Sequence, residues 1–173
     1  TFTSDLRFRR ASKELYKDMN GLVRRVKNDD VPYWEAVCEQ YLQLPDGLPA
    51  GIVQKAAEII APVIDSDFDT EYAKSEALEN YLRSSEFTYT ERPGEVPNGV
   101  DFVEYFLSTK KGCCTYFASA MVVMARSQGI PSRVVVGYAP GTLDETGNYL
   151  VYQSDAHAWV EWYYKGLGWI AFD

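Results

Sequence analysis

Residues 112–118 read Gly-Cys-Cys-Thr-Tyr-Phe-Ala, and an apolar stripe at helical spacing runs through and beyond them. The stripe consists of Phe117, Met121 and Met124, and it predicts a helix that begins near Cys114. We expect this helix to end at Gly129-Ile130-Pro131, since glycine suits the residue after a helix and proline blocks continuation. Cys114 then lies in the first turn, where unpaired N–H groups and the helix dipole stabilise a thiolate and lower the pKa of the thiol.

The cysteine pair is also compatible with two purely structural roles. Cys113 and Cys114 can be small core residues at the start of a helix, or they can form a strained vicinal disulfide. Gly112 removes side-chain bulk where a substrate backbone would approach, and the N–H groups of the first turn can hydrogen-bond an oxyanion. The helix by itself does not separate the reactive from the structural interpretation.

His157, the only histidine, precedes a strand pattern, Ala158-Trp159-Val160-Glu161-Trp162. A turn at 165–168 predicts a hairpin that places Trp159 roughly opposite Asp173, with His157 diagonally adjacent and within side-chain reach. A thiol, an imidazole and a carboxylate are the parts of an acyl-transfer triad: Cys114 as nucleophile, His157 as base and Asp173 as the group that orients it. The alternatives are a core or surface histidine and a disordered terminal aspartate.

The first half of the chain is predicted to be helical and the last third to be strands. Predicted helices cover 15–26, 34–42, 50–60 (with Pro62 discouraging continuation), 73–82 with Asp69 or Thr70 as its cap, and a short segment from Asp101. Predicted strands cover 87–90, 133–138, 149–152, 158–164 and 169–172. Helices followed by an antiparallel sheet give an α+β fold. We expect a helical annex over 1–44 and a catalytic domain over 45–173, together forming one compact unit.

Charge is distributed unevenly along the 173 residues. The net charge is −8, but residues 1–28 hold eight Lys or Arg and three acidic residues, so the remainder carries −13. An acidic body argues against a nucleic-acid enzyme, because phosphate binding needs a basic face. The basic segment can contact an anionic membrane or pack on the acidic body, but a solvated helix face is the simpler interpretation.

Cysteine and histidine usage predicts neither a disulfide framework nor a metal site. Three cysteines, two of them adjacent, cannot form a regular set of bridges, and Cys38 lies on an apolar stripe as a buried structural thiol. One histidine and two neighbouring cysteines lack the spacing of a tetrahedral zinc site, so we expect no metal and no other cofactor. No run is long enough to span a membrane. The chain starts without Met and stops at Asp173, so we expect it to be a piece of a longer protein.

Four blocks of sequence resemble the bacterial transglutaminase-like superfamily. They are Lys111–Ala118, Arg126–Tyr138, His157–Glu161 (His-Ala-Trp-Val-Glu) and Gly168–Asp173 (Gly-Trp-Ile-Ala-Phe-Asp). The family pattern Gly-x-Cys-x-x-aromatic-Ala, followed by Gly-Ile-Pro-x-Arg and Gly-Tyr, selects Cys114, which has an aromatic residue at +3 and alanine at +4. Position 113 is more often aromatic or aliphatic in the family, and the family usually continues with Pro-Thr after the position of Asp173. The resemblance is strong over 101–173. Over 41–90 the resemblance is weaker, and there the sequence is similar to the extracytoplasmic domain of multi-spanning membrane transglutaminase-like proteins.

The resemblance implies a papain-like fold with the nucleophile helix packed on an antiparallel sheet. It implies thiol-dependent acyl transfer on protein or peptide amides by Cys114, His157 and Asp173, giving crosslinking or deamidation without calcium or another cofactor. It also implies an extracytoplasmic location, with membrane attachment through segments absent from this chain. Oxyanion help is expected from the N–H of Cys114 and from a side chain such as Tyr89 or Tyr138, while the tryptophans 159, 162 and 169 either wall a substrate channel or belong to the core.

Two other functions remain open. A cysteine peptidase or amidase acting on peptides or cell-wall peptides would use the same three residues on a different amide. A non-catalytic binding or scaffold domain would keep the fold without the reaction.

Overall fold

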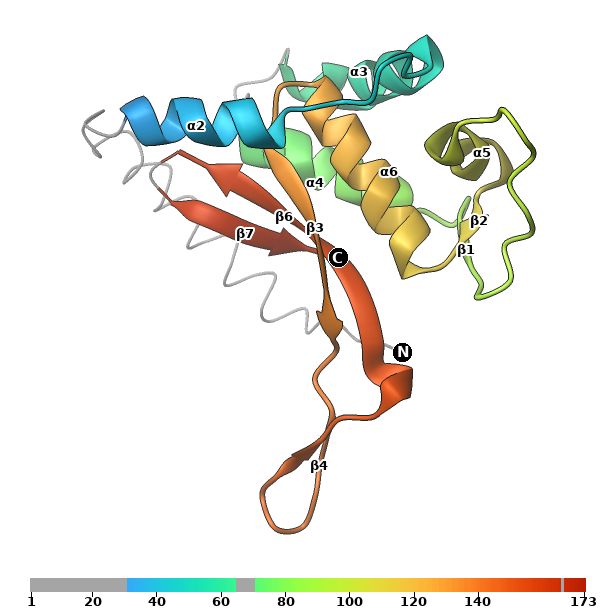
Figure 1. Ribbon diagram of the computed structural model, residues 1–173, viewed down its shortest axis with the longest axis vertical. Coiled ribbons are helices and arrows are strands. Elements are labelled where there is room, and N and C mark those ends of the chain that lie inside the picture. Colours follow the sequence, from blue (N-terminus) through green and yellow to red (C-terminus); the bar gives the residue numbers. More distant parts are fainter. Residues whose placement is uncertain (1–30, 65–70, 166) are drawn as a thin grey trace.

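The computed structural model describes residues 31–64, 71–165 and 167–173, and it has a mixed α+β fold (Figure 1). The helices are α2 (Val31–Tyr41), α3 (Ala50–Ile64), α4 (Glu71–Leu82), α5 (Phe102–Thr109) and α6 (Cys114–Ser127), with a 3₁₀ turn η1 (Gln153–Asp155). The strands are β1 (Thr88–Tyr89), β2 (Lys111–Gly112), β3 (Ser132–Tyr138), β4 (Thr142–Leu143), β5 (Tyr149–Leu150), β6 (Ala156–Tyr164) and β7 (Gly168–Phe172). The predicted helix at 15–26 and the predicted caps at 69 and 70 lie outside the described residues.

An antiparallel sheet with the order β3–β6–β7 forms the centre of the fold. Helix α6 packs across β6 and β3, and α3, α4 and α5 surround the sides of α6 that the sheet leaves open (Figure 1). Helix α6 is buried on several faces because its small and flexible apolar side chains pack closely against the sheet and the other helices. Its buried residues are Ala118, Ala120, Met121, Val122, Met124 and Ala125. The predicted packing of the helix that begins at Cys114 on an antiparallel sheet is confirmed.

The main core lies between α6 and the sheet. On β6 it takes Ala158, Val160 and Trp162, and the Trp162 ring, which is 0% exposed, stacks on Phe172 of β7 at 4.6 Å. Every second residue of β6 therefore points at α6, as a strand with a period of two requires. Deeper in the same core, the Tyr164 hydroxyl donates to Ser75 of α4 at 2.6 Å, which joins β6 to the helical layer.

The opposite face of the sheet is covered by α2. The Tyr163 ring lies 5.8 Å from Tyr33 and 5.9 Å from Trp34, and Trp169 of β7 meets Tyr41 at 4.7 Å. The guanidinium of Arg133 lies 4.0 Å above the Trp169 ring. Aromatic contacts of this kind stabilise beyond the buried area alone, so α2 is attached to the sheet by specific contacts.

A tight connection joins α6 to β3, as the Gly-Ile-Pro stretch predicts. Gly129 has φ +78°, a conformation that glycine adopts without strain, and Ile130 follows it into the core at 2% exposure. Arg126 near the end of α6 donates to the Ser132 carbonyl through Nε at 3.0 Å and Nη2 at 2.7 Å, and to the Gln43 carbonyl at 2.8 Å. Burial lowers the pKa of Arg126, and the two carbonyls accept three hydrogen bonds from its guanidinium.

Two predictions of element boundaries are wrong. Helix α3 does not stop before Pro62 but continues to Ile64. Since only two residues follow Pro62 in the helix, the proline removes a single backbone bond in the last turn, and the buried residues Ile52, Ala56 and Ile60 already anchor the helix. The strand predicted at 149–152 is only the two-residue β5, because it pairs with the equally short β4.

No helix in the described ranges is long and apolar enough to cross a bilayer.

Candidate functional site

Cys114 is the first residue of α6, as predicted. Cys113 occupies the N-cap position in an extended conformation, and its side chain makes no capping bond. Its sulfur lies 3.3 Å from the Thr115 hydroxyl oxygen instead. The first N–H groups of the helix have no acceptor within the helix, so they can serve an anionic oxygen placed at Cys114.

Gly112 permits the tight approach that positions this turn. A Cβ built on Gly112 would lie 2.4 Å from Cβ of Tyr116 and 3.0 Å from the Phe106 ring. Gly112 also accepts a backbone bond from Thr90 at 2.8 Å, within the parallel pair of β1 and β2. Glycine is therefore needed here for close packing of the backbone, at a residue two positions before Cys114.

The pairing of β1 with β2 places Tyr89 beside the candidate nucleophile. Tyr89 lies opposite Gly112, and its hydroxyl interacts with both the backbone N–H and the thiol of Cys114. Burial raises the pKa of Tyr89, the bond from the Cys114 backbone lowers it, and the charge and thiol of Cys114 raise it again, for a net increase. The hydroxyl therefore keeps its proton at neutral pH and can donate a hydrogen bond.

His157 and Asp173 are brought together by the sheet. Val160 pairs with Phe172, so Asp173 follows opposite Trp159, and His157 Nε2 lies 2.8 Å from Asp173 Oδ2. The hairpin register predicted from the sequence is thus confirmed. Arg83, which follows α4, donates to the Asp173 carbonyl oxygen and fixes the backbone of this residue from the helical layer.

Trp159 supports the histidine from its own strand. The two rings stack at 6.4 Å with 24° between their planes. Gly137, which pairs with His157 on β3, leaves room for the indole: a Cβ there would lie 2.9 Å from Cη2 of Trp159. Trp159 thus contacts the candidate base, whereas Trp162 is a core residue and Trp169 packs against Arg133 and the aromatic rings near α2.

The helix start and the sheet edge share one core. Ala118, one turn along α6 from Cys114, and Ala158, which follows His157, are both buried in the main cluster, and Cys114 itself packs against that cluster. The thiol and the imidazole are therefore carried by two elements locked to each other by packing. Of the two tyrosines considered for oxyanion binding, Tyr89 interacts with Cys114, whereas Tyr138 lies at the end of the edge strand β3. No sequence signal distinguished them, because the β1–β2 pairing joins segments more than twenty residues apart.

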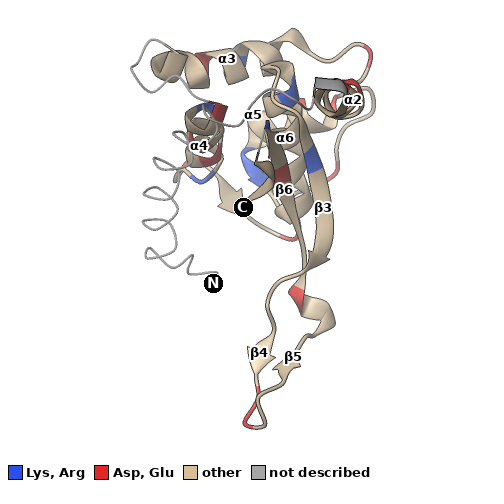
Figure 2. Cartoon of the chain, turned by 90° about the vertical axis from the view of Figure 1, so that its left-hand side faces the viewer, with Lys and Arg blue, Asp and Glu red and all other residues tan. Residues whose placement is uncertain are grey.

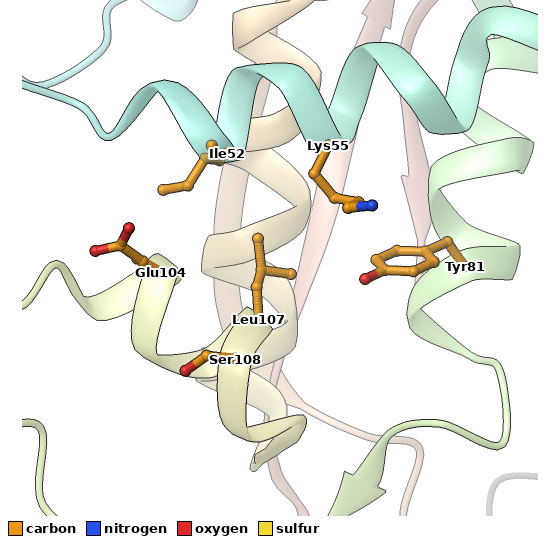
Figure 3. Close-up of a pocket in the computed structure, with 7 residues that line it drawn as sticks. Ile52, Lys55, Tyr81, Glu104, Leu107 and Ser108 are labelled. Atoms are coloured by element: carbon orange, nitrogen blue, oxygen red, sulfur yellow. The ribbon is translucent and has the colours of Figure 1, made fainter.

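A separate pocket opens between α3, α4 and α5 (Figure 3). It has a volume of about 210 Å³, and the residues around it are Gly51, Ile52, Lys55, Tyr81, Glu104, Leu107 and Ser108. Lys55 is paired there with Glu58 at 2.5 Å. None of the predicted catalytic residues lines this pocket. Among the described residues, no group of three or more His, Cys, Asp or Glu side chains is placed to hold a metal ion.

Comparison with known proteins gives consistent matches. The Bacillus subtilis protein YebA is 42% identical over 142 residues, which are 78% of this chain and 19% of YebA. A protein-glutamine gamma-glutamyltransferase of Pseudomonas aeruginosa is 44% identical over 99 residues, 56% of this chain and 14% of that enzyme. The chain therefore spans less than a fifth of these relatives.

A solved structure shares the architecture. The periplasmic domain of TgpA from Pseudomonas aeruginosa superposes with a TM-score of 0.69 at 36% identity, covering 80% of this chain and 46% of that domain. The family model of the transglutaminase-like superfamily matches residues 60–173, which contain α4, α5, α6 and the whole central sheet. The chain belongs to the transglutaminase-like superfamily and has its papain-like fold.

Proposed function

We propose that this chain is a thiol-dependent acyltransferase that acts on protein or peptide amides, with Cys114 as nucleophile, His157 as general base and acid, and Asp173 as the orienting carboxylate. The observation that carries the proposal is the 2.8 Å contact between His157 Nε2 and Asp173 Oδ2, on a strand packed against the helix that Cys114 begins. Family membership supports the reaction class.

The contact with Asp173 defines the protonation pattern of the imidazole. In the neutral form, Nε2–H donates to the carboxylate. This leaves Nδ1 to accept the proton of the Cys114 thiol in the proposed reaction. The resulting imidazolium is stabilised by Asp173, and the thiolate is stabilised by the first turn of α6.

The reaction begins when the thiolate sulfur attacks the carbonyl carbon of a carboxamide. The carbonyl oxygen becomes an oxyanion, which accepts hydrogen bonds from the Cys114 N–H and from the hydroxyl of Tyr89. His157 gives its proton to the departing nitrogen, so ammonia leaves and a thioester forms. An amine or water then attacks the thioester, His157 takes the proton of the attacking group, and the thiolate leaves. An amine yields a crosslinked amide, and water yields a carboxylate.

The first test is the pH dependence of Cys114 alkylation by iodoacetamide, with the modified residue identified by mass spectrometry. We expect labelling to remain fast well below the pH at which an ordinary thiol ionises, and to slow in His157→Ala. Cys38 in the same digest is the internal control, because burial raises the pKa of its thiol and should keep it slow. Ordinary labelling that does not depend on His157 would favour a non-catalytic domain.

The second test separates the possible acceptors. A labelled primary amine and a glutamine-rich protein are incubated with the chain, with and without EDTA. Amine incorporation in both samples supports the transferase, and ammonia release without incorporation identifies deamidation. Release of cleaved peptide without incorporation would instead assign a peptidase or amidase.

The location of the chain and its division into domains are also proposals. The periplasmic domain of TgpA suggests that this chain lies on the extracytoplasmic side of a membrane, attached through segments outside it. The division into an annex over 1–44 and a catalytic domain over 45–173 also stays a proposal. Limited proteolysis that leaves 45–173 folded would support the division.

A further inference from the structure

Strand β3 presents an apolar row at the edge of the central sheet. Val134, Val136 and Tyr138 are 40%, 77% and 59% exposed, and they alternate with less exposed residues. They lie on the sheet face that α6 covers at β6, but β3 is the outer strand and reaches beyond that cover. Three exposed apolar side chains in register are a surface that a protein usually covers with a partner.

The backbone of β3 has an unused edge on the same residues. The bonds Ala139 N–H to Asp155 O, at 2.7 Å, and Tyr163 N–H to Pro131 O, at 2.9 Å, show that odd-numbered positions of this segment face β6. By the alternation of an antiparallel ladder, the N–H and C=O groups of Val134, Val136 and Tyr138 point outward. Over residues 31–64, 71–165 and 167–173, no strand or side chain hydrogen-bonds to these outward groups.

The apolar row continues onto an arm formed by β4 and β5, which projects from the body below the sheet (Figures 1 and 2). The exposed side chains of the arm and of the return to β6 are Leu143, Tyr149, Leu150, Val151 and Tyr152. A two-stranded hairpin with so much exposed apolar surface has little to stabilise it in isolation. We call the surface made of the β3 edge and this arm the edge–arm surface.

The edge–arm surface is acidic. Residues 134–164 contain four carboxylates and no lysine or arginine, and Figure 2 shows acidic colour at the tip of the arm and at η1 with no basic residue on the arm. Glu161 is neutralised by Arg133 at 2.6 Å, which leaves Asp144, Glu145 and Asp155 without a cationic neighbour on this segment. Hydrogen bonds from the Thr146 hydroxyl and from nearby backbone N–H groups lower the pKa of Asp144, so its charge persists.

We propose that the edge–arm surface binds an extended, basic segment of the substrate polypeptide, which adds to β3 as a fourth strand. The outward N–H and C=O groups of β3 form backbone hydrogen bonds with the docked segment. The apolar row contacts every second side chain of that segment, and the acidic arm attracts its lysine and arginine residues. That this polypeptide is a substrate rests on the proposed function.

The position of this surface gives the binding a role in the reaction. Gly137 near the end of β3 pairs with His157, so a segment docked on β3 runs about two strand spacings, roughly 10 Å, from the strand of the candidate base. Docking there holds the rest of the polypeptide near the site and raises its effective concentration. Protein substrates with basic extended segments are therefore expected to be used better than short peptides.

The test is direct binding of a fluorescein-labelled peptide that alternates lysine with valine and tyrosine and contains no glutamine, followed by fluorescence anisotropy. A peptide with glutamate in place of lysine is the matched probe. We expect saturable, salt-sensitive binding of the lysine peptide and at least tenfold weaker binding of the glutamate peptide.

Two sets of variants locate the binding. Val136→Pro removes one outward N–H without removing a bond to β6, and Val136→Thr keeps that N–H as its control. We expect Val136→Pro to weaken binding at least tenfold and Val136→Thr at most threefold. The double variant Asp144→Asn, Glu145→Gln removes two charges from the arm tip and should weaken binding several-fold, even if Val136→Pro proves unfolded by near-UV circular dichroism.

The outcomes separate this inference from the proposed function. Peptide binding without any thiol reactivity would retain the surface and reject the acyltransferase. Acyl transfer from a short glutamine peptide to an amine, without binding of the lysine peptide, would overturn the inference and leave the acyltransferase intact. Equal binding of both peptides, or binding unchanged in both sets of variants, would also overturn it. Self-association in sedimentation that Val136→Pro abolishes, without peptide binding, would assign the edge to a second copy instead.

Discussion

The contact between α6 and β6 and the arm formed by β4 and β5 use apolar side chains in opposite ways. At the α6–β6 contact, Ala158, Val160 and Trp162 are at most 2% exposed. This packing fixes the helix that begins at Cys114 against the strand that contains His157. On the arm, Tyr149 is 66% exposed and local hydrogen bonds in the turn are the main ordering contacts. Similar apolar residues therefore stabilise the fold in one region and remain available for binding in the other.

The largest effect is expected on the rate of acyl transfer, from a substitution of Asp173 at the end of the packed region. Asp173→Asn should slow acyl transfer by about a hundredfold to ten-thousandfold, because the amide no longer selects the productive tautomer of His157 or stabilises its positive charge. The measurement is kcat/KM for amine incorporation, with the remote, exposed Glu58→Gln on α3 as the control. A rate within twofold of wild type would show that the carboxylate does not orient the base.

The second prediction concerns stability and compares one aromatic residue from each region. Trp162→Ala should lower the free energy of unfolding by about 3–5 kcal/mol, because it leaves a cavity in the core. Tyr149→Ala on the arm should change it by no more than about 0.5 kcal/mol. Urea unfolding measures both, and similar losses from the two variants would mean that the arm is part of the folded core.

The third prediction uses two glycines that both lack room for a side chain. Gly112→Ala should cost about 1–3 kcal/mol, because its Cβ would meet the Tyr116 and Phe106 side chains inside the packed region. Gly141→Ala would bring a Cβ to the backbone of Leu150 on the arm, where the two strands can separate without disturbing the core. We therefore expect faster amide exchange in the arm with little change in global stability.

A control accompanies the glycine pair. Gly51 in α3 has no atom near its would-be Cβ, and alanine is the better helix former, so Gly51→Ala should be neutral or slightly stabilising. If Gly141→Ala lowered the melting temperature as much as Gly112→Ala, the proposed independence of the arm would be wrong.

The smallest effect is expected on the pKa of Asp144 at the tip of the arm. Hydrogen bonds, first of all from the Thr146 hydroxyl, hold the pKa of Asp144 below its ordinary value, so Thr146→Ala should raise it and Thr146→Ser should restore it. Because the pKa is lower in the folded turn than in the unfolded chain, ionised Asp144 stabilises the turn above the unfolded pKa. That contribution is lost as the pH falls through the folded pKa. Side-chain carboxyl chemical shifts followed by NMR measure the change, and an unaltered titration in Thr146→Ala would refute this account.

Local features of the sequence were sufficient for much of the fold. The stripe through Phe117, Met121 and Met124 and the stop at Gly129 predicted α6, because helix periodicity and end signals act within a few residues. The hairpin register was equally local, since a short turn and a period of two bring Asp173 to His157. The assignment of catalytic roles to Cys114, His157 and Asp173 remains a prediction.

Other features depend on contacts between distant segments, and only the tertiary structure decided them. The parallel pairing of β1 with β2 selects Tyr89 over Tyr138 as the neighbour of Cys114, and packing of α6 on one face of β6 makes Trp162, not Trp159, a core residue. Helix α3 continues past Pro62 because its buried residues Ile52, Ala56 and Ile60 hold it in the core. The exposure of Val136 follows from the strand order β3–β6–β7, which leaves β3 at the edge. Sequence patterns specify which face of an element is apolar, but the assembled layers determine whether that face is covered.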